Sequence, residues 1–371
     1  RAVGVETTTE VGIFVVPAIT GRPDIIEELH AAGARFKPSR LGTSPLHYAA
    51  RHASSATWSV VAPLVHLVKV DPNGHRGTPG QTPLEIACRH LFRGFSAKFA
   101  VALLENGASA KGQRIVFILA GKRVPEAVDV GKAIMPWLTP EELNECGTMS
   151  PLALAIHDRH LEFADTLMAT GSVDVNALGS KNGSALYHAA SCVDHAWAER
   201  LIAAGADPNT GISPLYGLLV MADRRVYGFD YTERSDDVVR MLKLLLDHGA
   251  DPNAAPVLAV AARRGLAPVV DLLLDSGADP NRYASCSTEE HTPLIAAAGG
   301  PSPDPAIVKR LVLSGATAVR AQRPADFRGP WFTAHTPMTR FTSTLVGRDL
   351  RGPCSWRDNP YGYVKARANI Y

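Results

Sequence analysis

One five-residue pattern recurs along this chain of 371 residues: Gly205-Ala206-Asp207-Pro208-Asn209, Gly249-Ala250-Asp251-Pro252-Asn253 and Gly277-Ala278-Asp279-Pro280-Asn281. A glycine can end a helix in the left-handed conformation, proline cannot continue that helix, and Asp and Asn side chains favour turns. Each copy therefore predicts the end of a helix and an outward turn. Weaker copies stand at Gly33-Ala34, Asp71-Pro72-Asn73, Gly107-Ala108, Val173-Asp174-Val175-Asn176 and Gly315-Ala316.

A second pattern opens a helix between successive turns. Ser or Thr caps a helix by accepting a backbone N–H, proline at the first helical position loses no hydrogen bond, and small residues let helices pack closely. Pro83 and Pro151 lie two periods of 34 residues apart, and Ala185 follows Pro151 by one more period. The copies are Ser44-Pro45-Leu46-His47-Tyr48-Ala49-Ala50, Thr82-Pro83-Leu84, Ser150-Pro151-Leu152, Ser184-Ala185-Leu186, Ser213-Pro214-Leu215, Pro256-Val257-Leu258 and Thr292-Pro293-Leu294.

Because both patterns keep the same register over most of the chain, it closely resembles the ankyrin-repeat family. The resemblance implies an all-α solenoid whose unit is a helix, a turn, a second helix and an extended finger. We expect nine units in residues 1–317, opening near residues 12, 44, 82, 114, 150, 184, 213, 256 and 292, with the first and fourth degenerate. In the family, a histidine after Pro-Leu supports neighbouring turns by hydrogen bonding; among the clear units only the first has it, as His47.

The last segment, residues 318–371, departs from the repeat in composition. It holds nine Lys or Arg against three Asp, a net charge of +6, and eight aromatic residues. Since a solenoid needs its last apolar face covered, we expect this segment to cap the stack through side chains such as Trp331 and Phe332. The alternatives are a degenerate tenth repeat opening at Thr336, and a basic, aromatic surface for RNA or single-stranded DNA.

Breaks in the repeat are the best guides to a binding site, because residues added to one unit form loops, often on the binding face. The seventh unit has such an insertion between residues 222 and 235, rich in aromatic residues and arginines, which are frequent binding anchors. An alternative is that these aromatics pack over a gap between units. The predicted binding residues are Arg224, Arg225, Tyr227, Phe229 and Tyr231 in this loop, and Arg40, His75, Arg76 and Tyr283 in the fingers.

The chain shows no recognisable motif for catalysis, metal binding or nucleotide binding. Cys88 with His90 and Cys192 with His195 each place two donors close together, but on separate repeats, whereas structural zinc needs four ligands in one closed set. Gly121-Lys122 lacks the rest of a phosphate-binding loop. We therefore predict no catalytic residue, no metal and no cofactor, and we interpret Cys192 as a small core residue.

Composition is that of a folded protein, with 46% hydrophobic residues, 20% charged residues and a net charge of +2. The apolar stretches are far shorter than the roughly 20 residues that cross a bilayer, so we expect no membrane span. The five cysteines are odd in number and far apart, which favours reduced thiols inside the cell, in the cytoplasm or the nucleus.

These features favour a protein-interaction module, an adaptor or scaffold that binds a protein or peptide partner through the concave face and the irregular loops. The alternative from another class is an enzyme with a cleft between the last repeats and the C-terminal segment, because fold alone does not decide function. Nucleic-acid binding by the basic, aromatic tail is the third hypothesis.

Overall fold

The computed structural model describes residues 12–37, 42–52, 55–75, 81–91, 95–221, 235–282, 284–286, 289–300 and 303–317. All of them belong to the first of two units into which the chain divides, Arg1–Ala321. They form short helices and one small pair of strands, so the predicted all-α fold class is confirmed. No helix within these ranges is long and apolar enough to cross a membrane.

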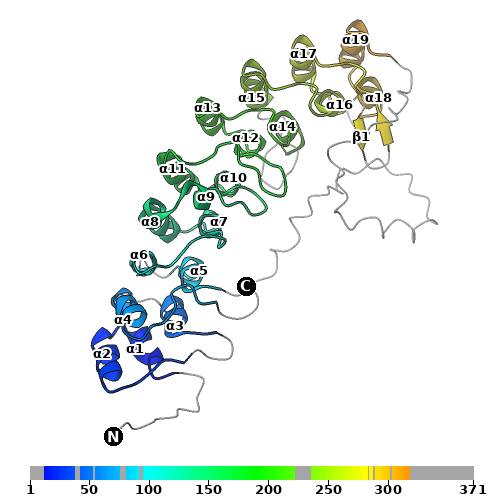
Figure 1. Ribbon diagram of the computed structural model, residues 1–371. Helices are drawn as coiled ribbons and strands as arrows, with labels where there is room; N and C mark the ends of the chain where they lie inside the picture. Colours follow the sequence, from blue (N-terminus) through cyan, green and yellow to red (C-terminus); the bar gives the residue numbers. More distant parts are fainter. Residues whose placement is uncertain are drawn as a thin grey trace, which may run out of the picture. The chain divides into compact units, whose positions relative to one another are not determined.

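A first layer consists of short helices, each of which contacts the next one of the layer along the chain (Figure 1). Each of these helices is only six to eight residues long. The first layer comprises α1 (Val15–Thr20), α3 (Pro45–Arg51), α5 (Pro83–Arg89), α7 (Ile115–Ala120), α10 (Pro151–His157), α12 (Ala185–Ser191), α14 (Pro214–Met221), α16 (Val257–Arg263) and α18 (Pro293–Ala298).

A second layer consists of helices that each pack on the preceding first-layer helix, so that the described residues form nine helix pairs stacked in chain order (Figure 1). We number these pairs one to nine along the chain. The second layer comprises α2 (Pro23–Ala31), the 3-10 helix η1 (Thr57–Val60) with α4 (Val61–His66), α6 (Phe95–Glu105), α8 (Pro125–Ile134), α11 (Leu161–Ala169), α13 (His195–Ala203), α15 (Ser235–Asp247), α17 (Ala267–Asp275) and α19 (Pro305–Leu313).

Three smaller features fill the connections. The 3-10 helix η2 (Met135–Trp137) and the single-turn helix α9 (Pro140–Leu143) follow α8. Before α18, strand β1 (Ala284–Cys286) pairs antiparallel with β2 (Glu289–His291). The finger predicted there as an extended turn is thus a short hairpin.

The helix starts follow from the capping pattern. Thr82, Ser150 and Ser184 each accept a hydrogen bond from the backbone N–H three residues on, at 3.1–3.2 Å. His47 accepts from the backbone N–H of Ser44 through Nδ1 at 3.1 Å, and its Nε2 lies 3.1 Å from the carbonyl oxygen of Gln81 in the next turn. His47 therefore links two turns, as the resemblance implied. Behind it, Leu46, Ala49 and Ala50 are fully buried.

The Asp-Pro-Asn turns are joined to one another by asparagine side chains. Asn209 donates from Nδ2 to the carbonyl oxygen of Gly249 at 2.8 Å, and its Oδ1 accepts from the N–H of Asp251 at 2.8 Å. Asp207 in turn accepts from the N–H of Asn209, which holds the asparagine in place. We call this two-bond link an Asn bridge. The same bridge is made by Asn73, Asn144, Asn176, Asn253 and Asn281.

One apolar core runs through the stack without a break, from Phe14 in pair one to Ala316 after pair nine. Close packing is visible at Gly131 in α8, where an added methyl group would come within 2.7 Å of the buried ring of Phe163 in α11. Since each pair touches chiefly its neighbours, such junctions carry the cohesion of the whole stack.

Candidate functional site

Most of the predicted binding residues lie outside the described residues, and their roles stay predictions. Among them, His75 is described; it is exposed and lines a hollow in the surface of the stack. The predicted residues outside the described ranges are Arg40, Arg76, Arg224, Arg225, Tyr227, Phe229, Tyr231 and Tyr283.

The hollow has a volume of about 510 Å³ and is open to solvent. Four successive parts of the chain line it: the turn after α4, helix α5, the turn before α7 together with α7, and Leu154 of α10. All of these belong to the first-layer helices or to the turns beside them. The hollow therefore spans the stack from the end of pair two to pair five.

The lining includes three apolar side chains, which we call the floor; we call its cations the rim. The floor consists of Phe117 and Ile118 of α7 and Leu154 of α10, which remain partly exposed. The ring of Phe117 is held from one side by the backbone at Gly147, where an added methyl group would come within 2.7 Å of the ring. A partly exposed aromatic side chain fixed in this way offers a rigid apolar contact to a ligand.

The rim of the hollow is cationic. Arg89, Lys111 and Arg114 are exposed there, and Lys122 is partly exposed. Glu85 is the one carboxylate among the described lining residues; its side chain is only 14% exposed and accepts from Arg89 Nε at 2.7 Å. Within the described parts of the chain, no ion pair occupies the side chains of Lys111, Arg114 or Lys122.

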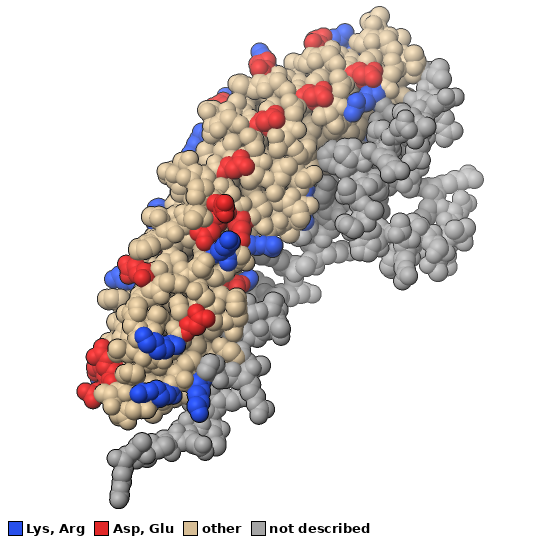
Figure 2. Space-filling view, in the orientation of Figure 1, with Lys and Arg blue, Asp and Glu red and all other residues tan. Residues whose placement is uncertain are grey.

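Elsewhere the surface charge is mixed. On the face seen in Figure 2, the described Lys and Arg side chains are interspersed with Asp and Glu side chains along the stack. Some charges of the stack are paired between neighbouring helices: Arg310 of α19 pairs with Asp271 and Asp275 of α17 at 2.9 and 2.5 Å. Lys111, Arg114 and Lys122 of the rim have no such pair among the described residues.

A polar frame holds the rim in position. Thr82 Oγ1 donates to Gln113 Oε1 at 2.5 Å, and the Gln113 amide nitrogen donates to the carbonyl oxygen of Ser109. These bonds tie the cap of α5 to the turn before α7. The backbone N–H of Arg114 donates to Glu145 Oε2 at 2.8 Å. The turn that presents the cations is therefore fixed by hydrogen bonds on both sides.

Arg114 has a strained backbone. Its φ is +51°, in the left-handed region that costs an ordinary residue about 1–2 kcal/mol, and it stands at the N-cap of α7 without a capping side chain. Most other first-layer helices have Ser or Thr at this position. Here the cap is replaced by a cation at the rim.

Lys111 also stands where the repeat elsewhere places a structural residue. Ser109-Ala110-Lys111 corresponds to Asp71-Pro72-Asn73 in the preceding repeat, and Ser109 Oγ accepts from the Lys111 N–H just as Asp71 accepts from Asn73. Lys111 therefore takes the place of a bridging asparagine. An ammonium group cannot accept the hydrogen bond that an Asn bridge needs.

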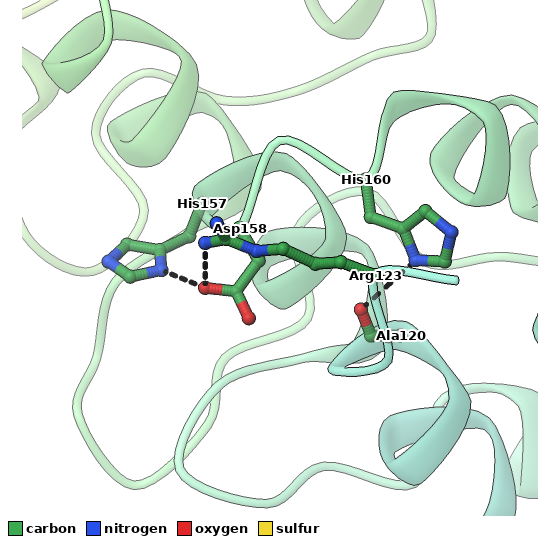
Figure 3. A network of polar contacts seen from close by, with 5 residues as sticks. All are labelled: Ala120, Arg123, His157, Asp158 and His160. Atoms are coloured by element: carbon green, nitrogen blue, oxygen red, sulfur yellow. Dashed lines mark hydrogen bonds and ion pairs between the residues drawn. The ribbon is translucent and has the colours of Figure 1, made fainter. Parts of the chain in front are cut away.

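Next to the hollow, charged and polar groups join pair four to pair five. Arg123 Nη2 donates to Asp158 Oδ1 at 3.1 Å, and His157 Nδ1 lies 3.0 Å from the same oxygen (Figure 3). Partial burial opposes ionisation of Asp158, but the hydrogen bonds from His157 and Arg123 outweigh it and hold its pKa below the usual value. His160 meanwhile contacts the carbonyl oxygen of Ala120 at 3.4 Å.

Beyond this network lies a buried histidine. Burial, with the nearby His157 adding to it, lowers the pKa of His188 to about 3. Its ring meets His157 and Tyr187 edge-on, with centroids 5.0 and 4.9 Å away. No hydrogen-bond partner for its Nε2 is found in the described residues. His188 is thus neutral at physiological pH and belongs to the core.

Three cysteines have described side chains: Cys88 is buried, and Cys146 and Cys192 are partly buried. Burial raises the pKa of Cys88 to about 12, and burial also raises the pKa of Cys192 and of Cys146. Because the thiolate is the nucleophile, these shifts lower their reactivity. Among the described side chains, no three His, Cys, Asp or Glu groups gather as metal ligands would.

The last described pair carries a second, apolar hollow of about 490 Å³ on α19. Val308, Val312 and Leu313 line it, and Leu313 is 73% exposed. Residues 318–371 lie outside the described residues, and with them the predicted cap, the tenth repeat, the enzyme cleft and the nucleic-acid surface.

Comparison with known proteins gives no relative to guide the assignment: no family model matches this chain, and no curated protein matches it. The hollow itself is therefore the main guide to function. Sequence reasoning had named His75 but missed Lys111, Arg114 and Lys122. Lys111 and Arg114 could have been found from their places in the repeat, because Lys111 stands where other repeats have a bridging asparagine and Arg114 where they have a helix cap.

Proposed function

We propose that this chain is a protein-interaction module of the ankyrin-repeat type, an adaptor that binds a protein or peptide partner through its first-layer helices and the turns beside them. The nine stacked helix pairs, the 34-residue period and the Asn bridges between turns support the repeat assignment. In such a stack, neighbour contacts supply the frame and exposed residues are free to vary.

The observation that carries the proposal is the construction of the hollow. Its lining comes from successive repeats and its floor is apolar. Three of its four rim cations, Lys111, Arg114 and Lys122, form no ion pair within the described residues. A ligand that lies along the stack can contact several repeats at once, as partner segments do in grooves. An apolar centre within a polar rim is also the usual composition of a protein-binding patch.

The test is capture of the partner by the full chain. The tagged full-length protein is incubated with an extract of its source cells, and retained proteins are identified by mass spectrometry. We expect a small set of proteins that bind the purified chain directly in titration calorimetry. The matched variant replaces the predicted loop, residues 222–234, with a Gly-Ser linker of equal length.

A weaker affinity of the loop variant would add the loop to the binding surface, whereas an unchanged affinity would remove it. Retention of no protein beyond that held by the tag alone would count against the adaptor function.

A further inference from the structure

We infer that the hollow over pairs three to five takes an acidic segment of the partner protein, with an apolar side chain on the floor and carboxylates at the rim. The inference rests on the proposed function and adds the chemical class of the partner. Two features of the described residues identify the acidic segment as the occupant: the positive charge of the rim and the apolar floor.

Positive charge outweighs negative charge around the hollow. Arg89, Lys111, Arg114 and Lys122 share the lining with one carboxylate, Glu85, which is largely covered and already bound by Arg89. Glu145, outside the lining, accepts through Oε2 from the backbone N–H of Arg114. The surroundings add to the positive field: partial burial and then the nearby cations Arg51, Lys122 and Arg89 lower the pKa of His90. An uncompensated cationic rim attracts carboxylates and repels basic segments, which sets specificity as well as the rate of encounter.

The positions of the cations in the repeat also favour a binding role. Lys111 replaces a bridging asparagine and Arg114 replaces a helix cap, so both give up a structural interaction made at most other turns of the stack. Positions that depart from a local structural rule are candidates for functional positions in folded proteins. The shared feature of these two replacements is a positive side chain at the hollow.

The apolar floor favours a segment of a protein over a small anion as the ligand of the hollow. Phe117, Ile118 and Leu154 offer a partly exposed apolar surface inside the cationic rim. Inorganic phosphate has no apolar group to place there, whereas a peptide can put an aliphatic or aromatic side chain on the floor and carboxylates on either side. Buried apolar anchors surrounded by polar contacts are the common arrangement of binding hot spots.

The experiment uses a random peptide library displayed on phage, selected against the full-length chain. Enriched peptides are synthesised with a fluorescent label and titrated by anisotropy. Each is also made with Asn and Gln in place of Asp and Glu. The test variant is Lys111→Ala/Arg114→Ala/Lys122→Ala. The matched control removes three exposed cations from second-layer helices: Lys98→Ala/Arg240→Ala/Lys243→Ala.

We expect enrichment of peptides that combine an apolar residue with flanking Asp or Glu. Each exposed ion pair contributes about two- to fivefold in affinity, so the test variant should bind roughly tenfold or more weakly, and the control variant should bind like the parent. Salt should weaken the complex as well, because the pairs are exposed and therefore screened. Circular dichroism of both variants checks that they fold, and Arg114→Gly provides a second rim variant.

Two results would overturn the inference while leaving the adaptor function standing: enriched peptides without acidic residues, or acidic peptides that bind the test variant as tightly as the parent. A selection that enriches no peptide also overturns it. The capture of proteins from extract judges the adaptor function separately. Full displacement of the peptides by inorganic phosphate, but not by sodium chloride of the same ionic strength, would instead assign the rim to a small anion.

Discussion

Two parts of the stack differ in how their turns are joined. In the second part, residues 144–317, each turn is linked to the next by an Asn bridge, beginning at Asn144. In the first part, residues 12–143, Asn73 alone makes such a bridge among the described residues. Lys37 and Lys111 stand at the corresponding positions, and the hollow opens almost wholly on this part.

Bridging asparagines and exposed lysines thus occupy the same position in different repeats. An Asn bridge adds two hydrogen bonds, each of which contributes about 0.5–1.5 kcal/mol. Because neighbour terms add along a repeat stack, a part with unbroken bridges should open less readily than a part without them. The first part lacks the stabilisation of some Asn bridges and has exposed cations at those positions.

The largest expected effect comes from Phe163→Ala, which weakens the junction between the two parts. Phe163 of α11 is fully buried against Gly131 of α8, and loss of such a ring costs about 3–5 kcal/mol. We expect the parts to uncouple, so that amides of α1 to α8 exchange hydrogen faster than those of α12 to α19. Hydrogen exchange with mass spectrometry measures both at once.

Leu273→Ala in α17 is the matched control, since it removes a fully buried side chain far from the junction. It should speed exchange chiefly around pairs eight and nine. Uniformly faster exchange in Phe163→Ala would mean that the two parts behave as one cooperative unit.

We expect acid to lower the free energy of unfolding of the second part of the stack through His188. The folded-state pKa of His188, about 3, lies below the usual value near 6.5, so below pH 6.5 the unfolded chain binds a proton that the folded chain does not. The free energy of unfolding should fall by about 1.4 kcal/mol per pH unit from this group, or about 2 kcal/mol at pH 5.

His188→Leu should remove that share of the acid dependence, since leucine does not titrate. Urea unfolding at several pH values between 8 and 5 gives the slope for both proteins. Parallel curves for the parent and the variant would show that His188 does not resist protonation in the folded state.

The third prediction breaks one bridge. Asn253→Ala removes the hydrogen bonds to Gly277 and Asp279, at 3.0 and 2.8 Å. Because both bonds are exposed and water can partly replace them, we expect a loss of about 1–2 kcal/mol in urea unfolding. Asn176→Ala, whose bridge to Gly205 and Asp207 shares no residue with that of Asn253, should cost about the same, and the double variant should cost roughly the sum. A cost near zero for both would remove the bridges as the source of the difference between the two parts.

The sequence could predict the frame because the frame is built from local chemistry. Thr82 caps α5 through a residue three positions away, and Gly277 ends its helix through its own φ of +85°. Such signals repeat with the period and need no knowledge of distant contacts. For the same reason the openings of the clear repeats could be placed to within a residue or two.

The candidate site could be predicted only in small part, because it depends on contacts between repeats. Lys122, in the turn after α7, and Leu154 of α10 both line the hollow, and nothing in either local sequence shows this. The Asn bridges were not predicted, because each joins two turns that are far apart in the sequence, and Asn144 comes from the end of α9 rather than from an Asp-Pro-Asn turn. The low pKa of His188 follows from its burial, which a single sequence does not show.

The smallest expected effect separates strain from binding at Arg114. Its φ of +51° is costly for arginine and free for glycine, but glycine adds entropy to the unfolded chain, so Arg114→Gly should gain only about 0.5–1 kcal/mol. Lys69→Gly is the matched control: Lys69 is exposed, has a φ of +62° and lies outside the lining of the hollow.

Both glycine variants should therefore raise the urea midpoint slightly. Only Arg114→Gly should weaken the binding of acidic peptides, by about two- to fivefold for one lost ion pair. Equal binding by the two variants would make Arg114 a strained turn residue with no part in recognition. If both variants gain stability but only Arg114→Gly loses affinity, the left-handed residue at the N-cap of α7 takes part in ligand binding.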